Sequence, residues 1–202
     1  QHVPSRAEDH LWYHDQCPSL QKTELPDLAK YLQTATPDAG NSVCVTYAID
    51  RIEDAHYEQA VPILVKLLDF QRPGLPYEHS YVMTHIPPDK YPARATLESI
   101  GMPAVPALLQ AISDKATTTV ARENALDALV LIYGRQVNLP YPAAAGIVRL
   151  KQEAANATDT DTKERLDSAV TEALSRCALW DSVRPKQVAA CQQAAKDGTV
   201  PQ

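Results

Sequence analysis

Two stretches of the sequence decide the fold: AVPILVKLLD at residues 60–69 and AVPALLQAISD at residues 104–114. They share their opening tripeptide at an offset of 44 residues, from 60 to 104. Their apolar positions also correspond, with Val61, Leu64, Val65 and Leu68 in the first against Val105, Leu108, Leu109 and Ile112 in the second. Each set has the i, i+3, i+4, i+7 spacing of an amphipathic helix. An offset of this length is typical of stacked helical repeats.

Each of these helices has a predicted partner helix upstream. The apolar stripe before residues 60–69 is Val45, Ala48, Ile49 and Ile52, and the stripe before residues 104–114 is Ala93, Leu97 and Ile100. The second link is very short: Gly101 suits the left-handed conformation that ends a helix, and Pro103 prevents the helix from continuing. Short links between amphipathic helices predict antiparallel helix pairs.

Apolar stripes predict further helices on both sides of these pairs. Towards the C-terminus they cover residues 120–134, about 142–156, 158–177 (which opens with Thr and Asp capping candidates) and about 185–196. The stripe residues are Ala121, Ala125, Ala128, Leu129 and Ile132, then Ile147, Leu150 and Ala154, then Leu166, Ala169, Val170, Ala173 and Leu174. Near the N-terminus Leu25, Leu28, Ala29 and Leu32 mark a helix with Pro26 in its first turn. We expect about nine helices and no strand, in line with the abundance of Ala and Leu.

The segment ARATLESIGMPAVPALLQAISD, residues 93–114, resembles a HEAT repeat of the short bacterial type. VARENALDALVLIYG, residues 120–134, resembles the first helix of a following repeat, and residues 43–69 carry a fainter copy. The resemblance covers about half of the chain. It implies an all-α, right-handed α–α superhelix (solenoid) of antiparallel helix pairs, as in HEAT and armadillo-type proteins.

We therefore expect one helical-repeat domain over residues 1–202. Its N-terminal cap covers about 1–42, its repeats about 43–156, and its C-terminal cap about 157–202. Residues 70–92, FQRPGLPYEHSYVMTHIPPDKYP, replace a tight turn between repeats. Such insertions often carry function. The alternative is a loop that covers an edge of the core with Tyr77, Tyr81, Val82, Met83 and Ile86. The charges near its two ends, Arg72 and Lys90, could pair with acidic partners, but exposed charges at such positions are usually solvated.

The four cysteines lie in two pairs near the ends of the chain, with none between. This favours two disulfides in an oxidising compartment over four unrelated buried thiols. Of the three possible pairings we predict Cys17–Cys44 and Cys177–Cys191, because each closes a short loop. The chain begins at Gln1 without Met, which is compatible with removal of a signal peptide. We expect a secreted or periplasmic protein.

The charge of the chain excludes some classes of partner. A formal net charge of −6 disfavours a nucleic-acid backbone and an anionic membrane surface. No run of about 18 apolar residues exists in the sequence, so no membrane insertion is expected. A protein or peptide remains as the predicted partner, and we expect a monomer.

The sequence contains few of the motifs that are typical of enzymes. There is no Gly-x-Ser-x-Gly elbow and no glycine-rich phosphate loop, so we predict no enzymatic activity, no catalytic residue and no cofactor. His10 and His14 have the i, i+4 spacing of metal ligands on a helix, and His79 and His85 lie in the insertion. These histidines are the candidate metal ligands, but Trp12 and Tyr13 between the first pair are better read as an anchor on the core.

Two hypotheses for function follow. The first is a non-catalytic interaction or scaffold module whose second helices present contacts such as Lys66, Gln110, Arg149 and Gln152. The second is a protein that handles a metal or small ligand, or an enzyme similar to phycobilisome lyases, with a site under the insertion at residues 70–92. Arg94 and Arg122 each lie early in the first helix of a repeat. We expect them to pair with an acid of the neighbouring repeat, such as Asp114, rather than with a ligand.

Overall fold

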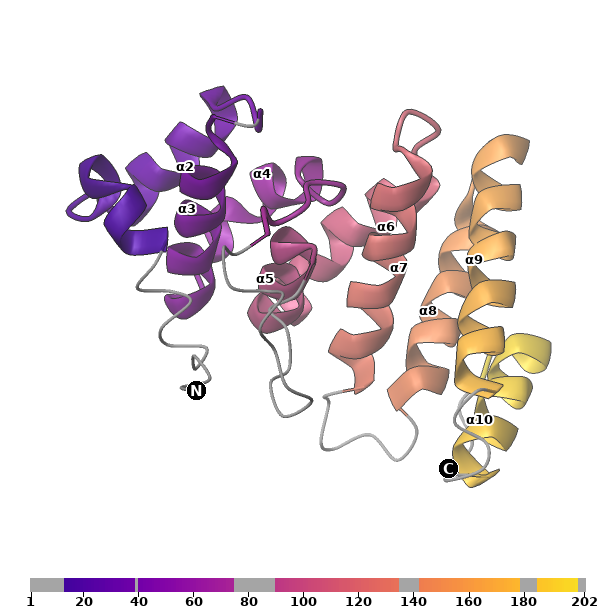
Figure 1. Cartoon of the computed structure of the whole chain (residues 1–202). Helices are drawn as coiled ribbons and strands as arrows, with labels where there is room; N and C mark the ends of the chain where they lie inside the picture. Colours follow the sequence, from indigo (N-terminus) through magenta and orange to yellow (C-terminus); the bar gives the residue numbers. More distant parts are fainter. Residues whose placement is uncertain (1–12, 39, 75–89, 135–141, 179–184, 200–202) are drawn as a thin grey trace. The chain divides into compact units, whose positions relative to one another are not determined.

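The computed structural model describes residues 13–38, 40–74, 90–134, 142–178 and 185–199. All regular structure within these ranges is helical, and none of it is a strand. After an α-helical turn at residues 13–16 come nine α-helices: α2 (Leu25–Thr34), α3 (Ser42–Asp54), α4 (Val61–Lys66), α5 (Pro92–Ile100), α6 (Val105–Ser113), α7 (Thr119–Gly134), α8 (Pro142–Asn156), α9 (Thr160–Ala178) and α10 (Pro185–Asp197) (Figure 1). The predicted all-α fold with about nine helices is confirmed.

The chain divides into two compact units, residues 1–100 and 101–202. Each has its own apolar core and one disulfide. The predicted pairing of residues 93–100 with residues 104–114 would span the boundary between the units. That pairing, the solenoid and the single repeat domain over residues 1–202 therefore stay predictions.

The first unit is built around α3, which packs against α2 and α5. The predicted stripe of α3 forms the centre of the core, because Val45, Ala48, Ile49 and Ile52 are all buried. In α2, Pro26 lies in the first turn as expected, since its missing N–H has no partner to lose there. The short helix α4 packs mainly against α5, so α3 and α4 are not the close pair that the sequence predicted.

The helix predicted over residues 60–69 is shorter in the structure. The α-helical part ends at Lys66, and the backbone N–H groups of Leu67 and Phe70 donate to carbonyls three residues earlier. Bonds of this 3₁₀ type give three residues per turn. Leu64 and Leu67, three residues apart, both lie on the buried side. Val65, which was predicted as part of the stripe, is half-exposed.

The internal repeat is visible as a repeat of local structure. A 3₁₀ helix at Glu58–Ala60 leads into α4, and 44 residues later a 3₁₀ helix at Met102–Ala104 leads into α6. Both α-helices carry proline in their first turn, Pro62 and Pro106. The same tripeptide thus begins a helix in the same way in both units.

In the second unit α7, α8 and α9 lie side by side (Figure 1). The helix α6 packs against α7 and α9, and α10 packs against α8 and α9. The predicted stripes are buried in α7 and α8. In α9 the last predicted position, Leu174, is half-exposed. The buried stripe continues instead at Cys177, four residues after Ala173, because Cys177 is bonded to α10.

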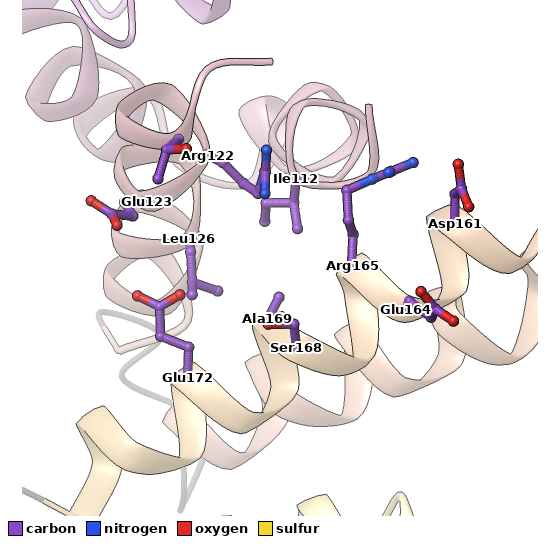
Figure 2. A pocket seen from close by; sticks show the side chains of 11 residues that line it. Ile112, Arg122, Glu123, Leu126, Asp161, Glu164, Arg165, Ser168, Ala169 and Glu172 are labelled. Carbon is purple, nitrogen blue, oxygen red and sulfur yellow. The ribbon is translucent and has the colours of Figure 1, made fainter. Parts of the chain in front are cut away.

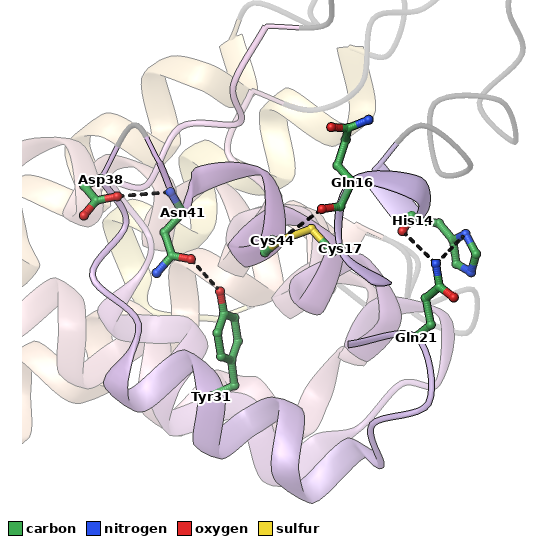
Figure 3. The surroundings of a disulfide bond; sticks show 8 residues. All are labelled: His14, Gln16, Cys17, Gln21, Tyr31, Asp38, Asn41 and Cys44. Atoms are coloured by element: carbon green, nitrogen blue, oxygen red, sulfur yellow. Dashed lines mark hydrogen bonds between the residues drawn. A yellow bond between two sulfur atoms is a disulfide. The ribbon is translucent and has the colours of Figure 1, made fainter. Parts of the chain in front are cut away.

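Both predicted disulfides are present. Cys17–Cys44 joins the N-terminal segment to α3 (Figure 3), and Cys177–Cys191 joins α9 to α10. The C-terminal end of α10 is also held by α8: Lys151 Nζ donates to the carbonyls of Ala195 (2.5 Å) and Lys196 (2.9 Å). A cation at these carbonyls satisfies acceptors that have no partner within the helix.

Candidate functional site

The predicted metal ligands are only partly described. His14 is placed, with its side chain 41% exposed, and its Nδ1 lies 3.1 Å from Asp15 Oδ1. The same Nδ1 lies 3.4 Å from Gln21 Nε2 (Figure 3). His10, His79 and His85 lie outside the described residues. Within the ranges that the structure describes, no group of three or more His, Cys, Asp or Glu side chains has the geometry to hold a metal ion.

The two ends of the insertion are held on the first unit. The backbone N–H of Arg72 donates to the carbonyl of Lys90 (2.9 Å), which closes the base of the segment between them. The Arg72 guanidinium donates to both carboxylate oxygens of Asp50, at 2.9 and 2.7 Å, and lies over the ring of Tyr13 at 5.2 Å. The Tyr13 hydroxyl donates to the carbonyl of Pro73 (3.2 Å).

This geometry decides between the two expectations for Arg72 and agrees with the prediction for Tyr13. Arg72 pairs with an acid and is not solvated, because its side chain is 8% exposed and that of Asp50 is 4% exposed. A bidentate arginine–carboxylate pair gives both side chains hydrogen-bond partners without contact with water, so both can be buried. Tyr13 is fully buried, as expected for an N-terminal anchor. Residues 75–89, with the five apolar and aromatic side chains predicted to cover the core, are not among those described, so both interpretations of the insertion stay open.

The predicted partner-contact residues are placed on α4, α6 and α8. Lys66, Gln110 and Gln152 are exposed, and the side chain of Arg149 is 43% exposed. Gln110 and Arg149 line a hollow of about 330 Å³ between α6, α8 and the start of α9, which we call the α6–α8 groove. Its walls are Pro106, Leu109, Gln110, Ser113, Arg149, Glu153, Asn156, Ala157, Thr162 and Leu166. Lys66, in the first unit, and Gln152 do not line it.

Six of the ten residues that line the α6–α8 groove are polar. Arg149 Nη2 lies 2.6 Å from Glu153 Oε1, one helical turn further along α8. Burial raises the pKa of the neighbouring Tyr133 hydroxyl. The Arg149 charge lowers this pKa, and the Glu153 charge raises it. With Gln110 opposite on α6, the groove offers amide, guanidinium and carboxylate groups to a ligand over the apolar side chains of Leu109 and Leu166.

A second hollow, of about 290 Å³, lies between α7 and α9, and we call it the α7–α9 groove (Figure 2). Its floor is apolar, with Ile112, Leu126 and Ala169 all buried. Its sides carry Thr119, Arg122, Glu123, Asp161, Glu164, Arg165, Ser168 and Glu172. None of these polar residues except Arg122 was singled out by the sequence.

Hydrogen bonds to backbone carbonyls hold the two arginines of the α7–α9 groove. Arg165 Nε donates to the carbonyl of Ser113 (2.7 Å), which joins α9 to the end of α6. Arg122 Nη2 donates to the carbonyl of Thr117 (3.1 Å), and Arg122 Nε is buried without a hydrogen-bond partner. The predicted pairing of Arg122 with Asp114 is not formed, because the Asp114 carboxylate instead accepts the N–H of Ala116 (2.8 Å) in the turn after α6.

The ends of α7 and α9 near this groove are fixed by side-chain caps. Thr118 Oγ1 accepts the N–H of Ala121 (3.1 Å) ahead of α7, and Asp159 Oδ1 accepts the N–H of Thr162 (2.8 Å) ahead of α9. The bond from Thr162 lowers the pKa of the Asp159 carboxyl, as expected for an acid at a helix N-terminus. The capping residues predicted for the segment at residues 158–177 are thus confirmed in part.

Electrostatic repulsion acts across the α7–α9 groove. Burial raises the pKa of the Glu172 carboxyl, and the Glu123 carboxylate on the facing helix raises it further. The sequence could not reveal this pair. Each glutamate is an ordinary polar residue of its own helix, and only the packing of α7 against α9 brings the two together.

Comparisons with protein-family models, with curated proteins and with solved structures found no match to this chain. Among the described helices, none is by itself long and apolar enough to cross a bilayer.

Proposed function

We propose that this protein is a non-catalytic interaction module that binds another protein or peptide through the surface of its helices. The HEAT-like solenoid predicted from the repeats belongs to this proposal, because stacked helix pairs present extended surfaces of this kind. The monomeric state expected from the sequence is part of the same proposal.

One observation carries the proposal. Gln110 and Arg149 are 39 positions apart in the sequence, on different helices, and both line the α6–α8 groove. Polar side chains over an apolar floor are the arrangement in which a bound segment buries area while its orientation is set by hydrogen bonds. Both residues were predicted as contacts from their positions on the outer faces of the helices.

Affinity capture with chemical crosslinking from the native source tests this proposal. The full chain is compared with a Gln110→Glu, Arg149→Glu variant and with a Lys186→Glu, Gln192→Glu control. The control makes the same charge change at two exposed positions of α10 that do not line the groove. We expect one reproducible crosslinked partner with the wild type and the control, and a loss of about tenfold or more with the groove variant. Equal capture by all three chains, or no reproducible partner, contradicts the proposal.

We further propose that the protein works in a secreted or periplasmic compartment. The support is that all four cysteines are paired in disulfides, which persist in oxidising environments. Mass mapping of protein from its native source, alkylated before reduction, is expected to recover both crosslinked cysteine pairs. Alkylated free cysteines at these positions would place the protein in a reducing compartment.

A further inference from the structure

The α6–α8 groove presents no net charge to a ligand. Among the ten residues that line it, Arg149 and Glu153 are the charged ones, and Arg149 Nη2 lies 2.6 Å from Glu153 Oε1. The other eight lining residues are uncharged. A charged side chain of a partner would lose its hydration in the groove without meeting an unpaired charge of opposite sign. The groove is therefore suited to an uncharged ligand.

Two of the four uncharged polar side chains of the groove already have partners within the chain. Ser113 Oγ donates to the carbonyl of Gln110 (3.0 Å), and Thr162 Oγ1 accepts from Arg165 Nη2 (3.5 Å). The other two are the carboxamides of Gln110, on α6, and Asn156, the last residue of α8. Both residues are exposed, and neither carboxamide has a hydrogen-bond partner among the residues that the structure describes. These two carboxamides are thus available to a ligand.

A carboxamide has the hydrogen-bonding groups that match those of a peptide unit. Its oxygen is an acceptor for a backbone N–H, and its NH₂ group is a donor for a backbone carbonyl. The peptide groups of a helix are already bonded within the helix, so only an extended segment has these groups available. Two carboxamides on different helices therefore favour an extended main chain as the ligand.

The rest of the groove is apolar. Leu109 and Leu166 are buried, and Pro106 and Ala157 also line the hollow. An apolar side chain of the ligand placed against these residues removes further area from water. The volume of about 330 Å³ lies near the lower end of the range for ligand sites, so the groove accommodates a short stretch of chain.

We propose that the α6–α8 groove binds a short, extended, uncharged segment of a partner protein through its peptide groups. Gln110 and Asn156 form the hydrogen bonds to the main chain, and an apolar side chain of the segment packs against Leu109 and Leu166. This inference rests on the proposed function and names the kind of segment that the groove takes. Binding of this kind tolerates different side chains in the ligand but disfavours charged ones.

Peptide binding to the full chain tests this inference. The probes are end-blocked, fluorescently labelled pentapeptides Gly-Ser-Xaa-Ser-Gly, in which Xaa is Ala, Val, Leu or Phe, and fluorescence anisotropy gives their Kd values. Two reference series replace both Ser residues with Lys or with Glu. A further reference is the tightest-binding neutral peptide, methylated on the nitrogens of Xaa and of the following Ser. Methylation removes two main-chain donors and leaves the side chains unchanged.

The groove variant is Gln110→Met, Asn156→Leu, which replaces both carboxamides with apolar side chains of similar size. The matched control is Gln152→Met, Gln192→Met, which removes two exposed carboxamides outside the groove. Circular dichroism verifies that each variant is folded.

We expect at least one neutral peptide to bind the wild type and the control with Kd values below about 1 mM and within about twofold of each other. The groove variant should bind it about tenfold more weakly, because the hydrogen bonds to the main chain are lost. The methylated peptide and both charged series should also bind the wild type about tenfold more weakly. Raising the NaCl concentration from about 0.05 to about 0.5 M should change the Kd of the neutral peptide less than about twofold.

Four outcomes overturn the inference. They are no neutral peptide with a Kd below about 1 mM, equal binding to the groove variant and the control, equal binding of the methylated peptide, and tighter binding of either charged series. The crosslinking experiment decides the proposed function separately. If the Gln110→Glu, Arg149→Glu variant loses the native partner but no neutral peptide binds, the proposed function stands and this inference is wrong.

Discussion

At the scale of single residues, Gly101 shows most directly how a backbone requirement selects an amino acid. Its φ of 82° and ψ of −138° lie in a region that L side chains adopt only with strain. A Cβ added there would meet no atom within 4 Å, so the strain is confined to the backbone. We expect Gly101→Ala to lower the free energy of unfolding by about 1–3 kcal/mol, measured by urea titration. Gly40→Ala is the matched control, because its φ lies outside the left-handed region; equal effects of the two changes would refute the argument.

The Asp50–Arg72 pair gives a second prediction at this scale. Both side chains are almost completely buried, so removing Asp50 leaves the buried Arg72 guanidinium without its carboxylate partner. We expect Asp50→Ala to lower the free energy of unfolding by about 3–5 kcal/mol. Adding Arg72→Met to the same chain should recover part of that loss, because it removes the buried charge. If the two effects simply add in a double-mutant cycle, the pair does not act as a unit.

These residues also show the limit of sequence-based prediction. Buried apolar positions such as Ile49 and Leu108 follow the helical period, so they could be predicted from the sequence alone. Asp50 is polar by every sequence criterion, and its burial depends on Arg72, which is 22 positions away. The same holds for the candidate site: Gln110 and Arg149 could be proposed as exposed residues, but which acids face each other across α7 and α9 is decided by packing.

At the scale of elements, helix existence was easier to predict than helix pairing. The stripes predicted α7 and α8 with closely similar bounds because both are long and strongly periodic. In contrast, α4 is only six residues long and is flanked by 3₁₀ turns, and it packs mainly against α5. A period of 3.6 residues cannot reveal the change to three residues per turn after Lys66, where Leu67 is buried.

The two disulfides lead to a prediction about the elements that they join. Cys177–Cys191 spans 14 positions and Cys17–Cys44 spans 27. The loop-closure model gives about 3 kcal/mol for the first and about 3.5 kcal/mol for the second, as the longer loop loses more entropy in the unfolded chain. We expect the Cys17→Ser, Cys44→Ser variant to lose more stability than the Cys177→Ser, Cys191→Ser variant, measured by urea titration without reductant. A larger loss at Cys177–Cys191 would show that its contribution comes from the packing of α9 on α10 rather than from chain entropy.

At the scale of the whole molecule, the chain divides at Gly101 into two compact units, each with its own apolar core. The second unit contains α6 to α10, one disulfide, and the Lys151 contacts that hold the end of α10. Its core is buried on all five helices, from Val105 to Ala194. About 100 residues with such a core is within the size range of independently folding domains. We therefore expect a fragment of residues 101–202, produced under oxidising conditions, to fold alone.

The expected signature of that fragment is a helical circular dichroism spectrum with a cooperative thermal transition and no free thiol. Both grooves are lined only by residues of this unit, so the fragment should retain both of them. A fragment with helical content but no cooperative transition would mean that the core of residues 101–202 needs residues 1–100 to pack. The two halves would then be parts of one folding unit, as a continuous repeat array requires, because each repeat in such an array is stabilised by its neighbours.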